Sequence, residues 1–600
     1  MYAKKLPVKK LNDFQVYIAE GYSIKGKKKD RYYENLGLLS ELKREHDDVG
    51  AFIKERIAYH EASKKERASK AYSFNVDYSE PIEENETFCS KKNASILLLN
   101  KVWADLKLEP FLRSWKFNSN KKIQYSINDA LRLMCFSRII NPGSKLSDIR
   151  GNNNYVERFD LNIDNLYDSL DLIDELSTKL TRKLSKECKE LMPGSDDGAI
   201  FYDCSNFYFE IQNADEEGLR AYGVEKNHRP DPIIEYGLLY HQDGYPIGSV
   251  TFRGNESETG SLIPLLINAG EEATNGKIIC ADAGLNTSGN KEKIHRSGRN
   301  YIFTQSLKSR KIDAEIRRQM IDGKGMTEYG EPDRKGRRKS YKSRWIIRGN
   351  GLQERLVVKF DPASYDFMVK TIEKRVEHAE KIIKNPSRLS LSKCSDGKEY
   401  IKRIVLDKNG EVMKDESELI LSREKIEEEK SLAGYYAYVT DIPSSRDTDE
   451  EYRDELARSG LRCVPLDDID IIKIGGKRND IEECFRTMKT DMDARPIYVR
   501  KEEHIKAHMF TVYMALTIMC ILRKKYLPNS TTNSIFESLR RYELGELDDL
   551  TYRTLYWDQN IGELSKKMNL NLAYKYHEIN KMRSLIGASK KANVKEKVNN

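Results

Sequence analysis

The most constraining feature of this chain is the order of strand-like and helix-like segments between residues 199 and 305. The strand-like segments are short runs rich in β-branched and aromatic residues, bounded by turn-forming residues. Residues 199–210 predict an apolar strand that runs into Asp203, followed by a second, aromatic strand. A hairpin, a helix, a strand, a helix and a strand follow in chain order, at 233–252, 256–273, 277–284, 291–295 and 301–305. The predicted architecture is an α/β domain built on a mixed sheet.

This order is that of a ribonuclease H-like sheet, in which the first and fourth strands are neighbours. Asp203 and Asp282 each stand at the end of an apolar run in those two strands, so we predict that their carboxylates approach each other. Two buried carboxylates without a cation are costly, because each loses its hydration and repels the other. The pair therefore predicts a divalent metal ion.

A third acid lies in the helix predicted for residues 477–489. Positions four and seven apart point in nearly the same direction on a helix, so Arg478, Glu482 and Lys489 share one face. A separate apolar stripe predicts that the helix packs against a core on another side. Taken alone, this spacing is also typical of an exposed helix with surface ion pairs.

Together these residues resemble the DDE transposases of bacterial insertion sequences. One subgroup of that family has the signature Tyr-x2-Arg-x3-Glu-x6-Lys in its last acidic helix, and Arg478, Glu482 and Lys489 match its spacing. The resemblance covers roughly residues 195–520. It departs from the signature at Gly475, where the tyrosine would stand.

The resemblance implies a metal-dependent enzyme with three catalytic acids. Asp203, Asp282 and Glu482 would be the catalytic residues and also the ligands of two Mg²⁺ ions, with Mn²⁺ as the alternative metal. Glu482 is preferred over the adjacent Glu483 because only Glu482 has the required spacing to the two cations, while Glu483 turns about 100° away.

The resemblance also implies how the enzyme acts on DNA. It would hydrolyse a phosphodiester at each element end and join the released 3′-hydroxyl to target DNA, while Arg478 and Lys489 hold phosphates. Its partners would be double-stranded DNA, namely terminal inverted repeats and target, and a second copy of the chain in a homodimer on DNA. Two alternatives stay open: a catalytically inactive or domesticated DNA-binding protein, and a ribonuclease H-like nuclease without strand transfer.

The composition indicates how large a DNA-binding surface can be and in which compartment the protein is expected. A net charge of +8 over 600 residues is modest, so such a surface has to be a local patch. The nine cysteines are scattered without a Cys-x-x-Cys pair, which fits a reducing cytoplasm. The longest apolar stretch is too short to predict a membrane span. We therefore expect a cytoplasmic protein that associates with the nucleoid when it binds DNA.

The clearest basic patch is residues 334–348, which contain eight cations and no acid. We expect its cations to contact DNA phosphates, and Tyr341 or Trp345 to stack on an unpaired base. The predicted DNA-binding residues of this segment are Arg334, Arg337, Arg338, Lys339, Arg344 and Trp345. The alternative is a solvated basic hairpin whose tryptophan belongs to the core.

Periodicity and composition divide the chain into six predicted segments. A hairpin with a charged helix, and then a helical domain for DNA binding or assembly, precede the ribonuclease H-like core. An inserted α+β domain separates the two parts of that core, and a helical region with a disordered tail ends the chain. The predicted boundaries are 1–75, 76–194, 195–306, 307–434, 435–530 and 531–600.

Overall fold

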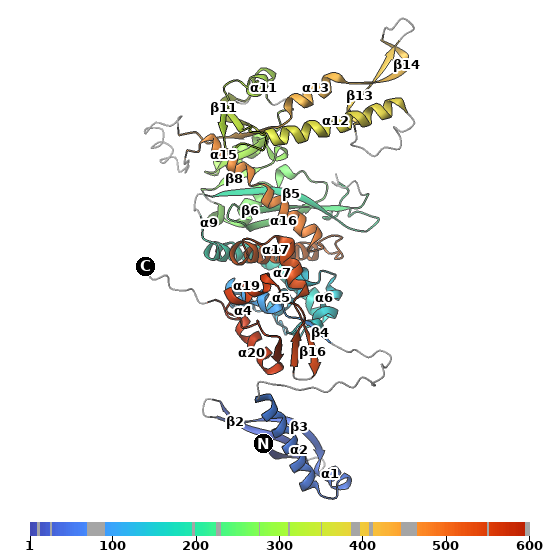
Figure 1. Ribbon diagram of the computed structural model, residues 1–600, viewed down its shortest axis with the longest axis vertical. Helices are drawn as coiled ribbons and strands as arrows, with labels where there is room; N and C mark the ends of the chain where they lie inside the picture. The colour runs from blue at the N-terminus through green and yellow to red at the C-terminus, as the bar shows by residue number, and fades with distance from the viewer. Residues whose placement is uncertain are drawn as a thin grey trace. The chain divides into compact units, whose positions relative to one another are not determined.

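In a computed structural model, the chain forms two compact units, Met1–Phe88 and Cys89–Asn600 (Figure 1). The predicted ribonuclease H-like core lies in the second unit, together with the helical regions that flank it in the sequence. The structure describes residues 1–8, 13–24, 27–68, 90–194, 198–223, 230–274, 276–309, 312–349, 351–385, 397–406, 412–445, 465–548 and 551–593.

The first unit is a three-stranded antiparallel sheet followed by two helices. In chain order its elements are β1 (Tyr2–Val8), β2 (Asp13–Ile24), β3 (Lys27–Leu38), α1 (Leu39–Glu45) and α2 (Val49–Ala68). The predicted N-terminal hairpin is β2 paired with β3, and β1 adds an edge strand to it. Glu34 of β3 accepts hydrogen bonds from Arg56 and is bonded to His60, which fastens α2 to the sheet.

The second unit is organised around a nine-stranded mixed sheet with the order β10-β11-β12-β15-β9-β8-β5-β6-β7. β8 runs parallel to both of its neighbours, β5 and β9, whereas β6 runs antiparallel to both β5 and β7. The predicted adjacency of the first and fourth core strands, β5 and β8, is confirmed. The strands are β5 (Ala199–Tyr208), β6 (Ile233–His241), β7 (Tyr245–Arg253), β8 (Ile278–Ala281), β9 (Asn300–Gln305), β10 (Thr327–Tyr329), β11 (Lys339–Ile347), β12 (Gln353–Phe360) and β15 (Tyr435–Thr440).

Helices cover both faces of this sheet. α8 (Leu262–Ala269) packs against β6 and β7, while α15 (Asp468–Gly476) packs against β9 and β15, and α16 (Asn479–Thr490) against β5. The hydroxyl of Tyr202 is bonded to Ser261 beside α8, and Ser205 is bonded to Lys489 of α16. Because side chains alternate along a strand, α8 and α16 lie on opposite faces. Nearby helices are α9 (Glu271–Thr274), α10 (Ser288–Arg296) and α11 (Ala314–Ile321).

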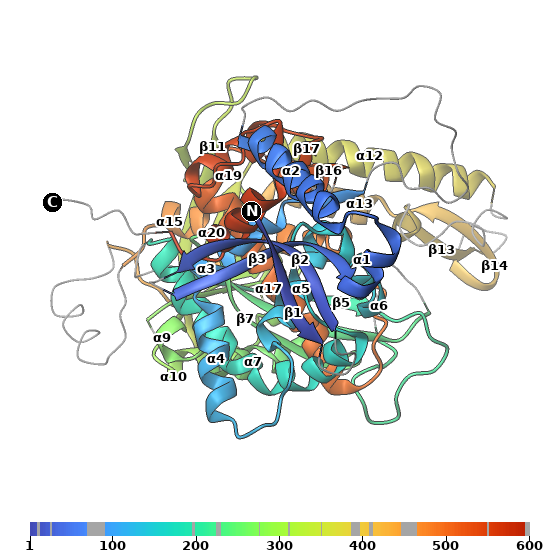
Figure 2. The same cartoon turned by 90° about the horizontal axis from the view of Figure 1, so that it is seen from below.

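Part of the segment predicted as an inserted domain belongs to the same sheet. β10, β11 and β12 join the core strands through β15, so they extend the sheet. The remainder projects to one side of the unit around a small apolar cluster of its own (Figure 2). It comprises α12 (Pro362–Lys384), β13 (Ile401–Leu406), β14 (Val412–Leu421) and α13 (Arg423–Leu432). The domain boundaries inferred from the sequence stay predictions.

The helices before and after the sheet in the sequence pack together around α17 (Glu502–Ile521), which contacts α3, α5, α7 and β7. Residues 502–526 are apolar and long enough to cross a membrane, but 94% of their most apolar window is buried inside the unit, as in a core helix. The other helices are α3 (Ile96–Asp105), α4 (Leu108–Asn118), α5 (Ile127–Ile140), α6 (Lys145–Gly151), α7 (Ile163–Leu191), α18 (Thr532–Arg541), α19 (Gln559–Lys567) and α20 (Ile579–Ser589).

The C-terminal region, which we expected to be helical, also contains strands. A four-stranded antiparallel sheet has the order β18-β17-β16-β4 and joins the two ends of the unit. Its strands are β4 (Lys91–Asn93), β16 (Glu543–Asp548), β17 (Thr551–Thr554) and β18 (Tyr576–Glu578). Such short, polar strands are stabilised by distant partners, so no local pattern predicts them.

Candidate active site

Asp203 lies in the middle of β5, not at its end. We expected an apolar strand that stops at this aspartate, but β5 continues through the aromatic residues that follow. Alternation along the strand points Asp203 and Ser205 to one face of the sheet and Tyr202 to the other. Since Ser205 is bonded to Lys489 of α16, Asp203 faces the side on which α16 packs.

Asp282 directly follows β8, as predicted, and caps the short 3₁₀ turn η3 (Ala283–Leu285). Its Oδ1 accepts a 2.7 Å hydrogen bond from the first backbone N–H of that turn. Tyr202 of β5 and Ala281 of β8 are register partners, so Asp203 and Asp282 come next on two parallel neighbouring strands. Adjacent strands lie about 4.8 Å apart, and residues in register point to the same face. The fold therefore brings these two aspartates to one side of the sheet.

Arg478 joins the second aspartate to the third acid. It stands at the N-terminus of α16, and its Nη1 donates to Asp282 Oδ1 at 2.9 Å and to Thr304 Oγ1 at 3.1 Å. Its Nη2 donates to Glu482 Oε1 at 3.3 Å, one helical turn further on. The side chains of Asp282 and Glu482 are 50% and 57% exposed, whereas that of Arg478 is 16% exposed. A guanidinium thus occupies the space between two predicted metal ligands.

Lys489, the last member of the predicted row, lies beside β5. Its Nζ donates a hydrogen bond to Ser205 Oγ and stands 5.4 Å from the centroid of the Phe207 ring. Ser205 is two residues beyond Asp203 on the same face of the strand. The polar face of α16 therefore contacts three strands: Arg478 lies over β8 and β9, and Lys489 lies over β5.

Glu483, the neighbouring acid, faces a different part of the structure. It accepts hydrogen bonds from Arg523 at 2.7 Å and from Thr532 at 2.8 Å. Burial alone would raise the pKa of Glu483, but these two hydrogen bonds and the charge of Arg523 hold it below its ordinary value. Glu483 fastens α16 to the C-terminal helices, while Glu482 is the acid that points toward Asp282.

A tyrosine of the sheet fills the position where the signature tyrosine is replaced by glycine. A Cβ atom on Gly475 would lie 2.3 Å from Cε1 of Tyr438, so a side chain fits there only if the ring moves. Tyr438 is buried on β15, in register with Thr304 of β9. Burial raises the pKa of Tyr438 to about 12, although the positive charge of Arg478 acts to lower it. Sequence analysis missed Tyr438 and Thr304 because their approach to the helix is long-range.

The three acids offer the hard oxygen ligands that Mg²⁺ and Mn²⁺ bind. Asp282 and Glu482 already converge on one cationic group, so this pair fits a divalent ion. Within the residues that the structure describes, no three His, Cys, Asp or Glu side chains come close enough to form a complete metal cage. Binding by all three acids would require a closer approach of Asp203 and a shift of Arg478, so the metal assignment stays a prediction.

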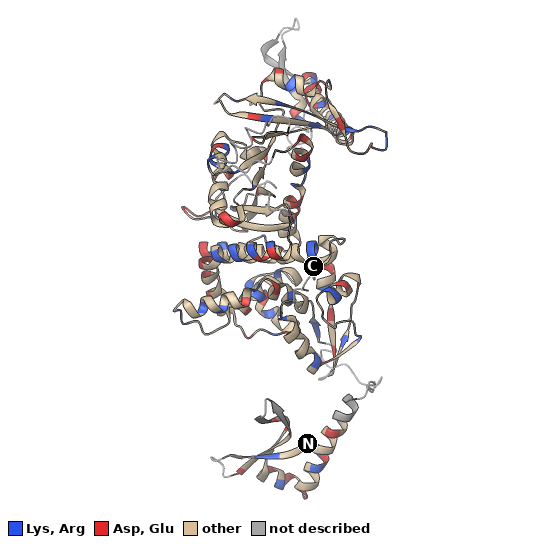
Figure 3. Ribbon diagram, turned by 90° about the vertical axis from the view of Figure 1, so that its left-hand side faces the viewer, with Lys and Arg blue, Asp and Glu red and all other residues tan. Residues whose placement is uncertain are grey.

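Acids from other elements neutralise much of the predicted basic patch. Arg337 forms ion pairs with Asp333 at 2.8 Å and with Asp366 at 2.7 Å, and Lys339 pairs with Asp361 at 3.1 Å. Three more cations of the segment are also paired with acids: Lys335, Lys342 and Arg348. Figure 3 shows the same mixing of acidic and basic residues over the helices and strands of this unit. The local sequence, which lacks acids, therefore overstates the charge of this surface.

Arg334 and Arg338 are the exceptions in this segment. Both side chains are exposed, and no ion pair joins either of them to another residue in the described parts of the chain. Arg344 is also exposed, and it donates to Gln319 Oε1 of α11 at 2.7 Å. These three arginines are the predicted cations that an anionic partner reaches most directly.

Trp345 is exposed, so the alternative of a core tryptophan is wrong. Its side chain is 39% exposed near the end of β11. Ser343, two residues earlier on the same face, donates to Asp468 of α15 at 2.7 Å. α15 leads directly into α16, so Trp345 lies on the same face of the sheet as the acids.

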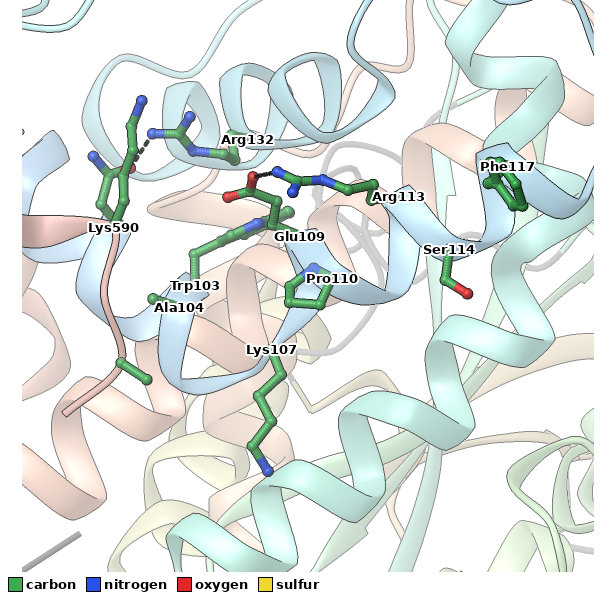
Figure 4. A pocket seen from close by; sticks show the side chains of 12 residues that line it. Trp103, Ala104, Lys107, Glu109, Pro110, Arg113, Ser114, Phe117, Arg132 and Lys590 are labelled. Carbon is green, nitrogen blue, oxygen red and sulfur yellow. Dashed lines mark hydrogen bonds and ion pairs between the residues drawn. The ribbon is translucent and has the colours of Figure 1, made fainter. Parts of the chain in front are cut away.

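Two cavities bear on the choice of site. A groove of about 420 Å³ begins at Ala283 and Thr304, beside the acids, and is walled by Tyr436 and the exposed Phe367 of α12. A pocket of about 740 Å³ lies among α3, α4 and α5 (Figure 4). Its Arg113 is bonded to Glu109, and none of the predicted site residues lines it. Thr304 in the wall of the groove accepts a hydrogen bond from Arg478, so the groove is the cavity that adjoins the candidate site.

Comparison with known proteins identifies a family that contains much of this region. Residues 237–518 match the family model described as "Transposase DDE domain". The matched range contains Asp282, Arg478, Glu482 and Lys489, and it begins after Asp203. No curated protein matches the sequence.

Proposed function

The chain belongs to the DDE transposases, and on that basis we propose that it hydrolyses DNA at element ends and joins the 3′-hydroxyl to target DNA. Asp203, Asp282 and Glu482 are the proposed catalytic carboxylates and metal ligands. The observation that best supports them is the convergence of Asp282 and Glu482 on one cation, beside the strand that holds Asp203.

DDE transposases generally use divalent metal ions, and two Mg²⁺ ions held here, or Mn²⁺ in their place, would activate the attacking oxygen and stabilise the leaving oxygen at phosphorus. The chain supplies the oxygen ligands from two neighbouring strands and one helix. Because the strands and the helix are parts of a packed core, the backbone positions of the acids are fixed before the substrate arrives, and only their side chains have to move to bind a metal.

Arg478 and Lys489 are proposed to hold phosphates on either side of the scissile bond. Arginine offers a planar fork that matches a phosphate, and lysine offers a compact charge. The helix that presents them is fixed at its far side, where Asp480 pairs with Lys524 at 3.0 Å and Glu483 pairs with Arg523. This support lets α16 present both cations toward the substrate with little freedom of its own.

The wider DNA contact is proposed to use the exposed residues near β11. Arg334, Arg338 and Arg344 would contact phosphates, and Trp345 would stack on an unpaired base. Arg337 and Lys339 also belong to the predicted contact, but each would have to exchange an aspartate for a phosphate. Double-stranded DNA, as terminal repeats and target, and a second copy of the chain are the proposed partners.

A binding-only protein is the second candidate function, and one observation favours it. Arg478 already neutralises Asp282 and Glu482 within the protein, so the carboxylates have a cation without a metal. A protein that had lost its catalytic role could keep this arrangement as a purely structural ion-pair network.

Cleavage of labelled DNA by the full-length protein decides between the two candidates. The substrates are end-labelled duplexes that span the inverted repeats flanking the gene, and the metals are Mg²⁺ and Mn²⁺. We expect nicks at the repeat boundary that are absent with Asp203→Asn and with Asp282→Asn, because each variant removes a charged ligand and keeps the side-chain size. Specific binding without any nick in either metal would favour the binding-only protein, and nicks without joined products would favour a nuclease.

A further inference from the structure

We propose that Arg478 couples DNA binding to metal binding at this site. The guanidinium and a divalent ion compete for the carboxylates of Asp282 and Glu482, while a DNA phosphate competes with those carboxylates for the guanidinium. DNA therefore raises the affinity of the protein for the metal, and the metal raises its affinity for DNA. The inference rests on the proposed function, because it takes DNA and a divalent ion as ligands of the same site.

The ion pairs of Arg478 use oxygens that a metal would need. Its Nη1 lies 2.9 Å from Asp282 Oδ1 and its Nη2 lies 3.3 Å from Glu482 Oε1, so the guanidinium sits between the two carboxylates. Like charges that share a partly buried site repel each other strongly. A divalent ion bound by both carboxylates therefore requires Arg478 to move away from them.

In its position between the two carboxylates, the guanidinium of Arg478 does not use all of its hydrogen-bond donors well. Its Nε–H is buried and has no acceptor among the described residues. The bond from its Nη2 to Glu482 is at the long end of the range for an N–H to oxygen bond. A phosphate instead accepts two parallel hydrogen bonds from a guanidinium. A phosphate at the site is thus a better partner for Arg478 than the two carboxylates are.

The surroundings of Arg478 permit an exchange of partners. Thr304 is a neutral third partner, whose Oγ1 accepts from Nη1 at 3.1 Å and does not depend on the state of the acids. Asp282 and Glu482 are about half exposed, so both DNA and a metal ion reach them from solvent. Arg478 can therefore leave the carboxylates while it stays beside β9.

This exchange makes the coupling reciprocal. By linkage, the factor by which DNA raises metal affinity equals the factor by which metal raises DNA affinity. Couplings between sites in proteins are typically about 5- to 150-fold. Lys489 differs from Arg478 here, because its side chain donates a hydrogen bond to Ser205 of β5.

Two binding measurements on the full-length protein test the coupling. The affinity for a fluorescent repeat-end duplex is measured by anisotropy with and without Ca²⁺ at constant ionic strength, and Mn²⁺ binding to the DNA-free protein is measured by electron paramagnetic resonance. The variants are Arg478→Gln, Arg478→Lys and Lys489→Gln. Arg486→Gln is the matched control for loss of charge, because Arg486 is exposed on the same helix and pairs with Glu483 instead.

Ca²⁺ should raise the DNA affinity of the wild type and of Lys489→Gln at least about 5-fold, and should raise that of Arg478→Gln by a clearly smaller factor, because only the direct contact between metal and DNA is left. DNA-free Arg478→Gln should bind Mn²⁺ at least about 5-fold more tightly than the wild type, while Arg486→Gln should match the wild type. Arg478→Lys keeps the positive charge but lacks the planar guanidinium, so its coupling should fall between that of the wild type and that of Arg478→Gln. If Arg478→Gln does not fold, Arg478→Lys is used in its place.

Two results would overturn the inference. One is an equal response of the wild type and Arg478→Gln to Ca²⁺, and the other is weaker Mn²⁺ binding by Arg478→Gln, which would mean that Arg478 supports the acids. Both leave the proposed function standing. Failure of every variant to bind Mn²⁺ even with saturating DNA would remove the proposed function itself, and the coupling with it.

Discussion

Arg478 and Asp282 stand 196 positions apart in the chain, and a 2.9 Å hydrogen bond joins them. This bond places the N-terminus of α16 at the carboxyl end of β8, and the next turn of the helix then brings Glu482 to the same guanidinium. The contact links the first half of the core sheet to the helix that follows the inserted segment. The site exists only because these two parts of the chain fold together.

The close approach of Gly475 to Tyr438 leads to a stability prediction. Gly475→Ala should destabilise the protein by about 1–3 kcal/mol, because its Cβ would lie 2.3 Å from the ring. In a Tyr438→Ala background the same substitution should be neutral or stabilising, since alanine favours a helix over glycine by about 1 kcal/mol. Denaturant unfolding of the two single variants and the double variant measures both values. Equal costs in the two backgrounds would show that the ring does not fill this position.

The ion pairs around β11 predict that its cations contribute unequally to DNA binding. Alanine at Arg334 and Arg338 should lower the slope of log affinity against log salt by about 0.9 for each lost phosphate contact. Alanine at Arg337 should change the slope less, because Arg337 is held by Asp333 and Asp366. Binding to repeat ends and to random duplexes should weaken alike, since phosphate contacts do not read sequence. An unchanged slope in Arg334→Ala/Arg338→Ala would remove this segment from the DNA-binding surface.

The exposure of Trp345 predicts a specific loss of binding without a loss of stability. Trp345→Ala should weaken binding by about 1–3 kcal/mol on DNA with an unpaired base near the cleavage site, and little on a continuous duplex. Its melting temperature should stay close to that of the wild type, because the side chain is not in the core. A lower melting temperature together with weaker binding to every substrate would instead indicate a packing role.

The lowered pKa of Glu483 predicts a pH-dependent contribution to stability. A carboxylate whose pKa is lower in the folded state stabilises the fold above its unfolded pKa, about 4.3, and this stabilisation disappears as the pH falls through the folded pKa. Glu483→Gln should therefore melt below the wild type at pH 7, and the difference should shrink below about pH 4.3. Thermal melts from pH 7 to pH 3 measure it. A difference that grows toward acid would contradict the assigned ion pair with Arg523.

Local patterns predicted most of the core sheet and the shared helix face of Arg478 and Glu482. The strands around Asp203 and Asp282 have strong apolar runs, and the adjacency of β5 and β8 follows from the order of the elements. The spacing on α16 separated Glu482 from Glu483, because a helix has only one geometry for residues four apart.

Contacts between distant segments account for what the sequence analysis missed. Tyr438 of strand β15 reaches Gly475 of helix α15, and Asp361 and Asp366 neutralise a segment that contains no acid of its own. β5 runs past Asp203 because the aromatic residues that follow favour a strand, and one polar side chain on the face toward α16 does not interrupt it. Side-chain packing and long-range ion pairing have no local sequence pattern, so they become visible only in the fold.

The most direct test of the catalytic assignment compares Glu482→Gln with Glu483→Gln in cleavage of a labelled repeat-end duplex with Mg²⁺. The two glutamates are adjacent, and the substitutions are chemically identical, but only Glu482 faces Asp282 and Arg478. Glu482→Gln should show no cleavage above background while it still binds the duplex, and Glu483→Gln should cleave at a temperature where it remains folded. Cleavage by Glu482→Gln at the wild-type rate would contradict the account.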